Sequence, residues 1–344
     1  MPLFFRAATA VVAAGSLALV SGAGAAQATD PYGTNASGTV FFPNPVQQLG
    51  LQDLTDMKDA DAPVFAAAYR RVVLTDLDGS GRLTGRYVRV KSETGRPAEA
   101  VNGQFPDFHR DSDQFEQVMG YYWVTEAQKY LQHLGFGSTL RPVNQRQIEL
   151  RINQFGPDNS FFRPNKANIT VGKGGVDDAE DAEVIIHEYG HSVQDGQVPG
   201  FGTNLESGSI GEGFSDYLAV VVTSWAAGVP ALTPEACVAD WDSISYTSTV
   251  PHCLRRVDTT KRYPDDVVGR VHADGQIWSG ALWDMRRVLG DTIATTIAVE
   301  AQFDFAVDTS FRAAALATVA AAQRLYGAAT AATVQAAFAG RGLL

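Results

Sequence analysis

Cysteine is scarce in this sequence, which limits the kinds of metal site that can form. Only two cysteines occur among 344 residues, Cys237 and Cys253, and they do not form a CxxC pair. A zinc site built on thiolates needs several such ligands, so none is expected here. In an exported protein two cysteines are typical of one disulfide that closes a loop, with a pair of free thiols as the alternative.

Clusters of basic residues are also missing. The chain has 27 Lys and Arg against 38 Asp and Glu, which gives a formal net charge of -11 at pH 7. An acidic surface repels nucleic-acid phosphates and anionic lipids. We therefore expect no nucleic-acid partner.

The sequence has one hydrophobic run near its start and no second one long enough to cross a membrane. Residues 1–28 combine Arg6, an apolar run and a small-residue end, which together predict a signal peptide. Cleavage is expected after Ala28, with Ala25 as the nearest alternative. A membrane anchor is the other interpretation, but the run is short for a span of roughly 20 residues. We expect a secreted monomer without a membrane anchor.

Composition divides the rest of the chain into three regions. Residues 29–110 are rich in strand-forming segments and turns, and residues 111–197 mix helical and extended patterns. Residues 198–344 are mostly helical, with an alanine-rich end. This order predicts an α+β protein that is β-rich before residue 111 and α-helical after residue 197.

The segment DLDGSGRL resembles the first half of a calcium-binding EF-hand loop. Asp76, Asp78, Ser80 and Gly81 match that half, but position 12 is Tyr87 and not the required glutamate. Both flanks have strand composition, so a glycine-rich hairpin turn fits better. A calcium-dependent adhesion or structural module is the alternative function that this segment allows.

The segment HEYGH points to a metal site. His187 and His191 are four residues apart, so on a helix both imidazoles project from one face and can bind one ion. Zinc is the natural occupant of such a pair. Glu188 lies between them and flanks the ion without binding it, which is the place of a general base.

The segment GEGFSD adds a second signal 21 residues further along. Glu212 and Asp216 are again four residues apart, at the start of a second expected helix. Glu212 as the third ligand would leave one position of a catalytic zinc open for water. Asp216 can accept the free ring N–H of a ligating histidine, and we expect His187. The alternative is a solvated acidic pair that complements the helix dipole.

The motif HEYGH followed by GEGFSD resembles the motifs of the gluzincin metallopeptidases, the thermolysin-like enzymes. The pattern GEGxSD is most similar to that of their fungalysin-like branch. The resemblance covers roughly residues 108–344. It implies a two-lobed zincin fold, with a β-rich N-terminal lobe, a helical C-terminal lobe and the zinc helix between them. It also implies that His272 in VHADGQIW donates a hydrogen bond to the oxyanion, and that Ala167 and Asn168 in NKANITV lie on the edge strand that binds substrate.

Two features qualify the resemblance. The thermolysin-like enzymes carry a tyrosine between the second zinc histidine and the glutamate ligand, whereas residues 192–211 contain none. No calcium motif of the family is recognisable, although calcium is compatible with an acidic run before HEYGH. That run is expected to supply charges that stabilise a helix N-terminus; its members are Asp177, Asp178, Glu180 and Asp181.

The sequence therefore predicts a secreted zinc endopeptidase that binds a polypeptide in extended form, with one catalytic Zn²⁺ and Glu188 as general base. Two alternatives share the same ligands. One is an exported zinc hydrolase with a non-peptide substrate, and the other is a catalytically weak protein that keeps zinc for stability.

Overall fold

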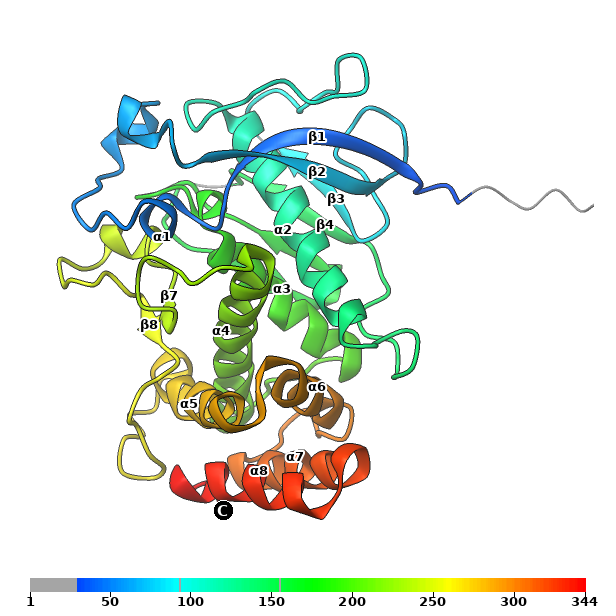
Figure 1. Cartoon of the computed structure of the whole chain (residues 1–344), viewed down its shortest axis with the longest axis vertical. Coiled ribbons are helices and arrows are strands. Elements are labelled where there is room, and N and C mark those ends of the chain that lie inside the picture. The colour runs from blue at the N-terminus through cyan, green and yellow to red at the C-terminus, as the bar shows by residue number, and fades with distance from the viewer. Residues whose placement is uncertain (1–29, 93, 155) are drawn as a thin grey trace, which may run out of the picture. The chain divides into compact units, whose positions relative to one another are not determined.

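In the computed structural model, strands come mainly before the candidate metal helix and helices mainly after it (Figure 1). The described residues are 30–92, 94–154 and 156–344, so the expected signal peptide lies outside them. The strands are β1 (Thr34–Phe41), β2 (Tyr69–Leu77), β3 (Val88–Ser92), β4 (Ile148–Ile152), β5 (Phe161–Arg163), β6 (Asn168–Thr170), β7 (Cys237–Val238) and β8 (Arg255–Arg256). The helices are α1 (Pro45–Leu49), α2 (Asp113–His133), α3 (Ala182–Gln197), α4 (Leu205–Ala227), α5 (Val271–Leu289), α6 (Asp291–Gln302), α7 (Phe311–Tyr326) and α8 (Ala328–Gly340). The expected α+β class is confirmed.

The main sheet has the strand order β3-β4-β6-β5. Strands β3, β4 and β6 are parallel, whereas β5 runs antiparallel to β6 and forms an edge. Helix α2 lies against this sheet closely enough that a Cβ on Gly120 would come 2.4 Å from Leu150 Cδ2. The edge strand β5 leads toward the candidate site.

The segment DLDGSGRL makes the expected turn, which one antiparallel bridge between Leu77 and Gly85 closes, but beyond this bridge the flanking strands β2 and β3 do not pair with each other. Strand β2 pairs antiparallel with β1 in a separate two-stranded sheet, and β3 joins the main sheet beside β4. Asp76 has a positive φ of 59° at this point. The strands diverge because each finds its partner in a distant segment.

Helices α3, α4 and α5 pack side by side around the candidate site, with α4 between the other two (Figure 1). Their close approach depends on glycine. A Cβ on Gly190 of α3 would lie 2.9 Å from Ser215 Cα, and one on Gly213 of α4 would lie 2.2 Å from the Gly275 carbonyl oxygen of α5. Any larger residue at either position would push the two helix backbones apart.

The acidic run before α3, which was expected to stabilise the helix N-terminus, is buried. Only Asp181 acts as a helix cap, since its side chain accepts a hydrogen bond from the Glu183 backbone N–H at 2.9 Å. Glu180 is fully buried and pairs with the equally buried Arg110, whose Nη2 lies 2.8 Å from Glu180 Oε2. Tertiary contacts therefore decide the role of this segment.

Residues Pro31–Leu344 form one compact unit. Within the part of the chain that the structure describes, none of the helices is both long and apolar enough to cross a membrane.

Candidate metal centre

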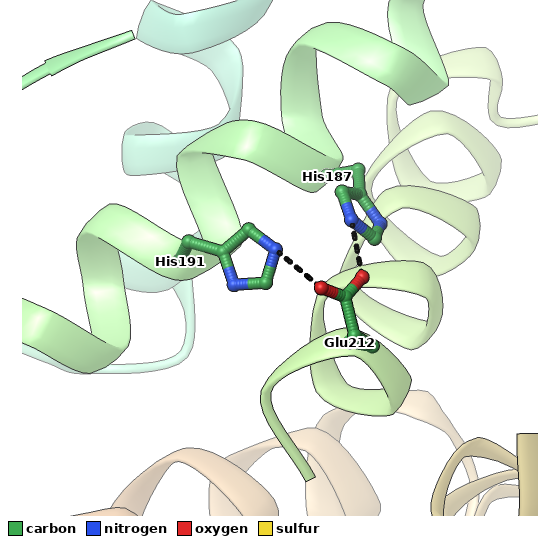
Figure 2. A group of neighbouring side chains, drawn as sticks. All are labelled: His187, His191 and Glu212. Carbon is green, nitrogen blue, oxygen red and sulfur yellow. Dashed lines mark hydrogen bonds and ion pairs between the residues drawn. The ribbon is translucent and has the colours of Figure 1, made fainter. Parts of the chain in front are cut away.

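Two helices carry the residues of the candidate centre. The cap at Asp181 starts α3 six residues before His187, so that His187 and His191 lie on the same face. Helix α4 begins with a capping box, in which Asn204 and Ser207 satisfy each other's backbone N–H groups. This start places Glu212 two turns into α4, opposite the two imidazoles (Figure 2).

Figure 2 shows the three expected ligands pointing toward one another. His187 Nε2 lies 3.1 Å from Glu212 Oε2, and His191 Nε2 lies 3.7 Å from Glu212 Oε1. One donor atom from each of the three residues lies within 4.8 Å of the other two. The structure therefore brings together two imidazole nitrogens and a carboxylate oxygen, the donor types that zinc prefers.

Asp216 also lies where the sequence suggested. Its Oδ1 is 2.8 Å from His187 Nδ1, and its side chain is only 1% exposed. A carboxylate at this distance holds a proton on Nδ1, so the neutral imidazole carries its lone pair on Nε2, the atom nearest Glu212.

Arg255 is a site residue that sequence reasoning missed. Its Nε and Nη2 each lie 2.7 Å from an oxygen of Asp216, in a two-point ion pair. Arg255 lies on β8, which pairs with β7, and the disulfide between Cys237 and Cys253 closes the loop that joins these strands. The expected disulfide is thus present, and it holds the strand that carries Arg255. No local sequence pattern marks this arginine, because its contact to Asp216 spans 39 residues.

The charges of the centre act on one another. Burial alone would raise the pKa of Glu212, but His191 and His187 lower it to about 2. Burial would lower the pKa of His187, yet its bonds to Asp216 and Glu212 raise it to about 10. His191 has no such short partner, so burial lowers its pKa to about 4. The negative charges of Glu212 and Asp216 thus favour a positive charge between α3 and α4.

Glu188 lies beside the three ligands without pairing with them. It is 6% exposed, and its Oε2 is buried without a hydrogen-bond partner. Burial raises its pKa to about 7, although the nearby His187 opposes the rise. A buried carboxylate with an unsatisfied oxygen is costly unless a ligand or water completes it.

His272 lies at the start of α5 and reaches the same carboxylate. Its Nε2 is 3.2 Å from Glu212 Oε2, while 60% of its side chain is exposed. Asp274 holds the loop before α5 in place, because its carboxylate accepts hydrogen bonds from the backbone N–H groups of Val268, Gly269 and Arg270. Sequence reasoning did not single out this residue. The structure therefore brings His272 to the centre from a third helix.

A cleft of about 390 Å³ opens over the centre. One side is formed by the edge strand β5 and its flanks, including Phe161, Phe162 and Pro164. Phe201, from the segment without a tyrosine, lines the cleft near α4. The cleft thus joins the polar centre to an open sheet edge.

Ala167 and Asn168 do not lie at this cleft. Strand β6, which begins at Asn168, is paired with β4 on one side and β5 on the other, so it has no free edge. Both residues line a different surface pocket, together with Arg89 and Glu149. The edge position expected for NKANITV belongs instead to β5, because the short chain reversal at residues 164–167 folds β5 against the outer side of β6.

Comparison with known proteins gives three similarities. The model of the Fungalysin metallopeptidase (M36) family matches residues 171–296, which include the two helices of the centre and His272. Extracellular metalloproteinase 2 of Phaeosphaeria nodorum is 32% identical over 118 residues, which are 30% of this chain and 17% of that protein. The chain therefore matches about a sixth of the length of this curated relative.

The third similarity concerns the fold. The structure of the precursor of protealysin, a metalloproteinase from Serratia proteamaculans, superposes with a TM-score of 0.57 at 16% identity, over 75% of this chain and 87% of that one. This likeness concerns the fold, and the resemblance to the fungalysin metallopeptidases is confirmed for residues 171–296.

Proposed function

We propose that this protein is a secreted zinc-dependent endopeptidase that hydrolyses peptide bonds with Glu188 as general base. The observation that carries the proposal is the convergence of His187, His191 and Glu212 from two helices, with the unpartnered Glu188 Oε2 beside them. Similarity to an extracellular metalloproteinase supports both the reaction and the location.

The donor set suits one zinc ion. Two imidazole nitrogens and one carboxylate oxygen are the three protein ligands typical of catalytic rather than structural zinc. His187, His191 and Glu212 would hold it, with Asp216 fixing the tautomer of His187. Zinc in such a site supplies a Lewis acid that polarises a carbonyl group and makes water more acidic.

Glu188 has the position needed to move the proton. Glu188 lines the cleft with the three ligands, and its Oε2 forms no hydrogen bond with the protein, so it can accept a proton from an attacking water. The same oxygen can then deliver that proton to the leaving amine. Zinc binding alone does not need a carboxylate here, so its presence favours catalysis over a purely structural centre.

Two groups can face the negative charge that develops on the carbonyl oxygen. His272 lies at the mouth of the centre and can donate a hydrogen bond from Nε2. Arg255 lines the same small pocket as His272 and is oriented by Asp216. With no tyrosine between His191 and Glu212, we propose that His272 carries most of this stabilisation.

The substrate would bind in extended form beside β5. An edge strand offers unpaired backbone groups to which a peptide can add as a further strand. Phe161 and Phe162 of β5 line the cleft, so a peptide on this edge would pass over the centre. This mode of binding depends on backbone more than on particular side chains.

The missing tyrosine supports one alternative, an exported zinc protein that is catalytically weak or acts on a non-peptide substrate. The test combines zinc content per chain with cleavage of a denatured protein by wild type, Glu188→Gln and, as a matched surface control, Glu99→Gln. We expect one zinc in all three proteins and cleavage by wild type and the control only. Zinc binding with no cleavage above Glu188→Gln would favour the alternative, and absence of zinc would refute the centre.

A further inference from the structure

Gln194 carries a buried amide whose two polar atoms both lack a partner. The residue lies on α3, three positions after His191, and lines the same cleft as the three expected ligands. It is 3% exposed, and neither its Oε1 nor its Nε2 forms a hydrogen bond with the described residues. A buried polar group without a partner is costly, so we expect a partner within reach of this amide.

His191 has a ring nitrogen without a partner. Its Nε2 lies 3.7 Å from Glu212 Oε1, and Figure 2 shows the other ring nitrogen, Nδ1, pointing away from Glu212. His187 differs, because Asp216 Oδ1 lies 2.8 Å from its Nδ1. A histidine that binds a metal through one nitrogen almost always donates the N–H of the other to an acceptor. Such an acceptor is in place for His187 and is still needed for His191.

The amide of Gln194 and the Nδ1 of His191 lie next to each other. Residues three apart on a helix are neighbours, and a long side chain leans back toward the helix N-terminus, which takes the amide toward His191. Both groups border Gly211 of α4, since a Cβ there would lie 3.3 Å from Gln194 Oε1 and 3.7 Å from His191 Nδ1. Because Gly211 has no side chain, the amide and the ring share the space beside it.

We propose that Gln194 is a positioning residue of the metal centre, and that its Oε1 accepts a hydrogen bond from the Nδ1–H of His191. The last torsion of a glutamine side chain has a broad energy minimum, so turning the amide toward the ring costs little. The oxygen is the atom required, because a neutral imidazole that offers Nε2 to a metal carries its proton on Nδ1. The bond holds the ring of His191 with Nε2 toward the ion.

A neutral acceptor suits the charges of the centre. Glu188 and Glu212 line the cleft, and Asp216 lies against His187, where Arg255 pairs with it. A further carboxylate would add repulsion to this group of acidic side chains. An amide oxygen accepts the same hydrogen bond and adds no charge.

Direct contact with substrate is the other role open to an amide in the cleft. Both polar atoms of Gln194 are buried, so a bound peptide would reach neither of them unless the side chain moved. The side chain of His191 is more accessible, with 23% of it exposed. Burial therefore favours a role in which Gln194 acts through His191.

This inference rests on the proposed zinc centre, and its test measures zinc binding besides cleavage. Gln194→Met keeps the length of the side chain and removes both polar atoms, so it should weaken zinc binding by about 10–100-fold in competition against a chelator. Gln194→Glu keeps an acceptor oxygen and should bind zinc as wild type does. Gln197→Met is the matched control, because Gln197 lies on the same helix and its amide bonds the Val299 carbonyl oxygen instead.

Two further measurements separate positioning from a structural role. Replacing a buried amide that lacks partners with an apolar side chain of similar shape is nearly neutral or stabilising. Zinc-free Gln194→Met should therefore have a melting temperature no lower than that of zinc-free wild type. In zinc-loaded protein with isotope-labelled histidine, the Nδ1–H of His191 should exchange slowly with water in wild type and faster in Gln194→Met. Gln194→Ala is the second variant if Gln194→Met does not fold.

The outcomes keep this inference apart from the proposed function. If wild type binds no zinc, both are overturned. If wild type binds zinc and cleaves while Gln194→Met binds zinc like Gln197→Met, the inference is overturned and the proposed function stands. A raised KM in Gln194→Met at unchanged zinc affinity would overturn it in favour of direct contact with the substrate. If wild type binds zinc without cleaving, the proposed function fails, and the comparison of zinc affinities still decides the role of Gln194.

Discussion

Replacing Asp216 with asparagine should damage both zinc binding and stability, although no zinc ligand changes. The carboxylate is 1% exposed and accepts three short hydrogen bonds, one from His187 at 2.8 Å and two from Arg255 at 2.7 Å. An asparagine amide keeps only one acceptor oxygen and carries no charge. Arg255 would then remain charged and buried without its partner.

The magnitude follows from that loss. Removing one partner of a buried ion pair costs roughly 3–5 kcal/mol of folding free energy. Loss of a carboxylate that orients a metal-ligating histidine typically costs about 10–100-fold in metal affinity or activity. We therefore expect both effects in Asp216→Asn, with the zinc affinity reduced by competition against a chelator and the stability reduced in denaturant.

The chain offers a matched control on the neighbouring residue of β8. Arg256 and Asp258 form a similar two-point pair, but their side chains are 38% and 35% exposed. An exposed pair contributes about 0–1 kcal/mol, so Asp258→Asn should change stability little and zinc affinity not at all. Equal effects of the two substitutions would refute the reasoning, because burial would then not be what makes the Asp216 pair important.

Three further predictions concern the scaffold. Gly213→Ala should destabilise the protein by about 1–3 kcal/mol, because its Cβ would lie 2.2 Å from the Gly275 carbonyl oxygen. Gly211→Ala should be tolerated, because its Cβ would lie 3.3 Å from the Gln194 side chain and 3.7 Å from the His191 ring; equal denaturation midpoints of the two variants would contradict this. Replacing Cys237 and Cys253 together with serine should cost about 3 kcal/mol, measured in denaturant, through the loop of 16-residue separation that the disulfide closes. Burial and Asp59 raise the pKa of Asp177 from 3.8 to about 8, so the folded protein keeps a proton that the unfolded chain releases, and this stabilisation is lost as the pH rises between those values. Asp177→Asn should therefore gain stability relative to wild type from pH 4 to pH 8, and a constant difference across that range would exclude the effect.

The residues of the candidate metal centre could be predicted from the sequence alone. The spacing of His187, His191, Glu212 and Asp216 is helical, and the rise and turn of a helix convert such spacing directly into a common face. The pair Cys237 and Cys253 was equally readable, because no other cysteine competes for either partner. The order of strands and helices also followed from local periodicity, which is a property of neighbouring residues.

Tertiary structure decided the features that depend on distant contacts. Arg255 contacts Asp216 across a separation of 39 residues, and no pattern in the surrounding segment LRRVD predicts this contact. The edge strand of the main sheet is β5 and not β6, since strand order in a sheet is set by pairing between segments and not by composition. The acidic run before α3 has the composition of a solvated helix start, yet packing buries Asp178 against carboxylates from two other segments. The local sequence shows which ionisable side chains are present. Their burial and their interaction partners depend on contacts between distant segments, which form only when the chain folds.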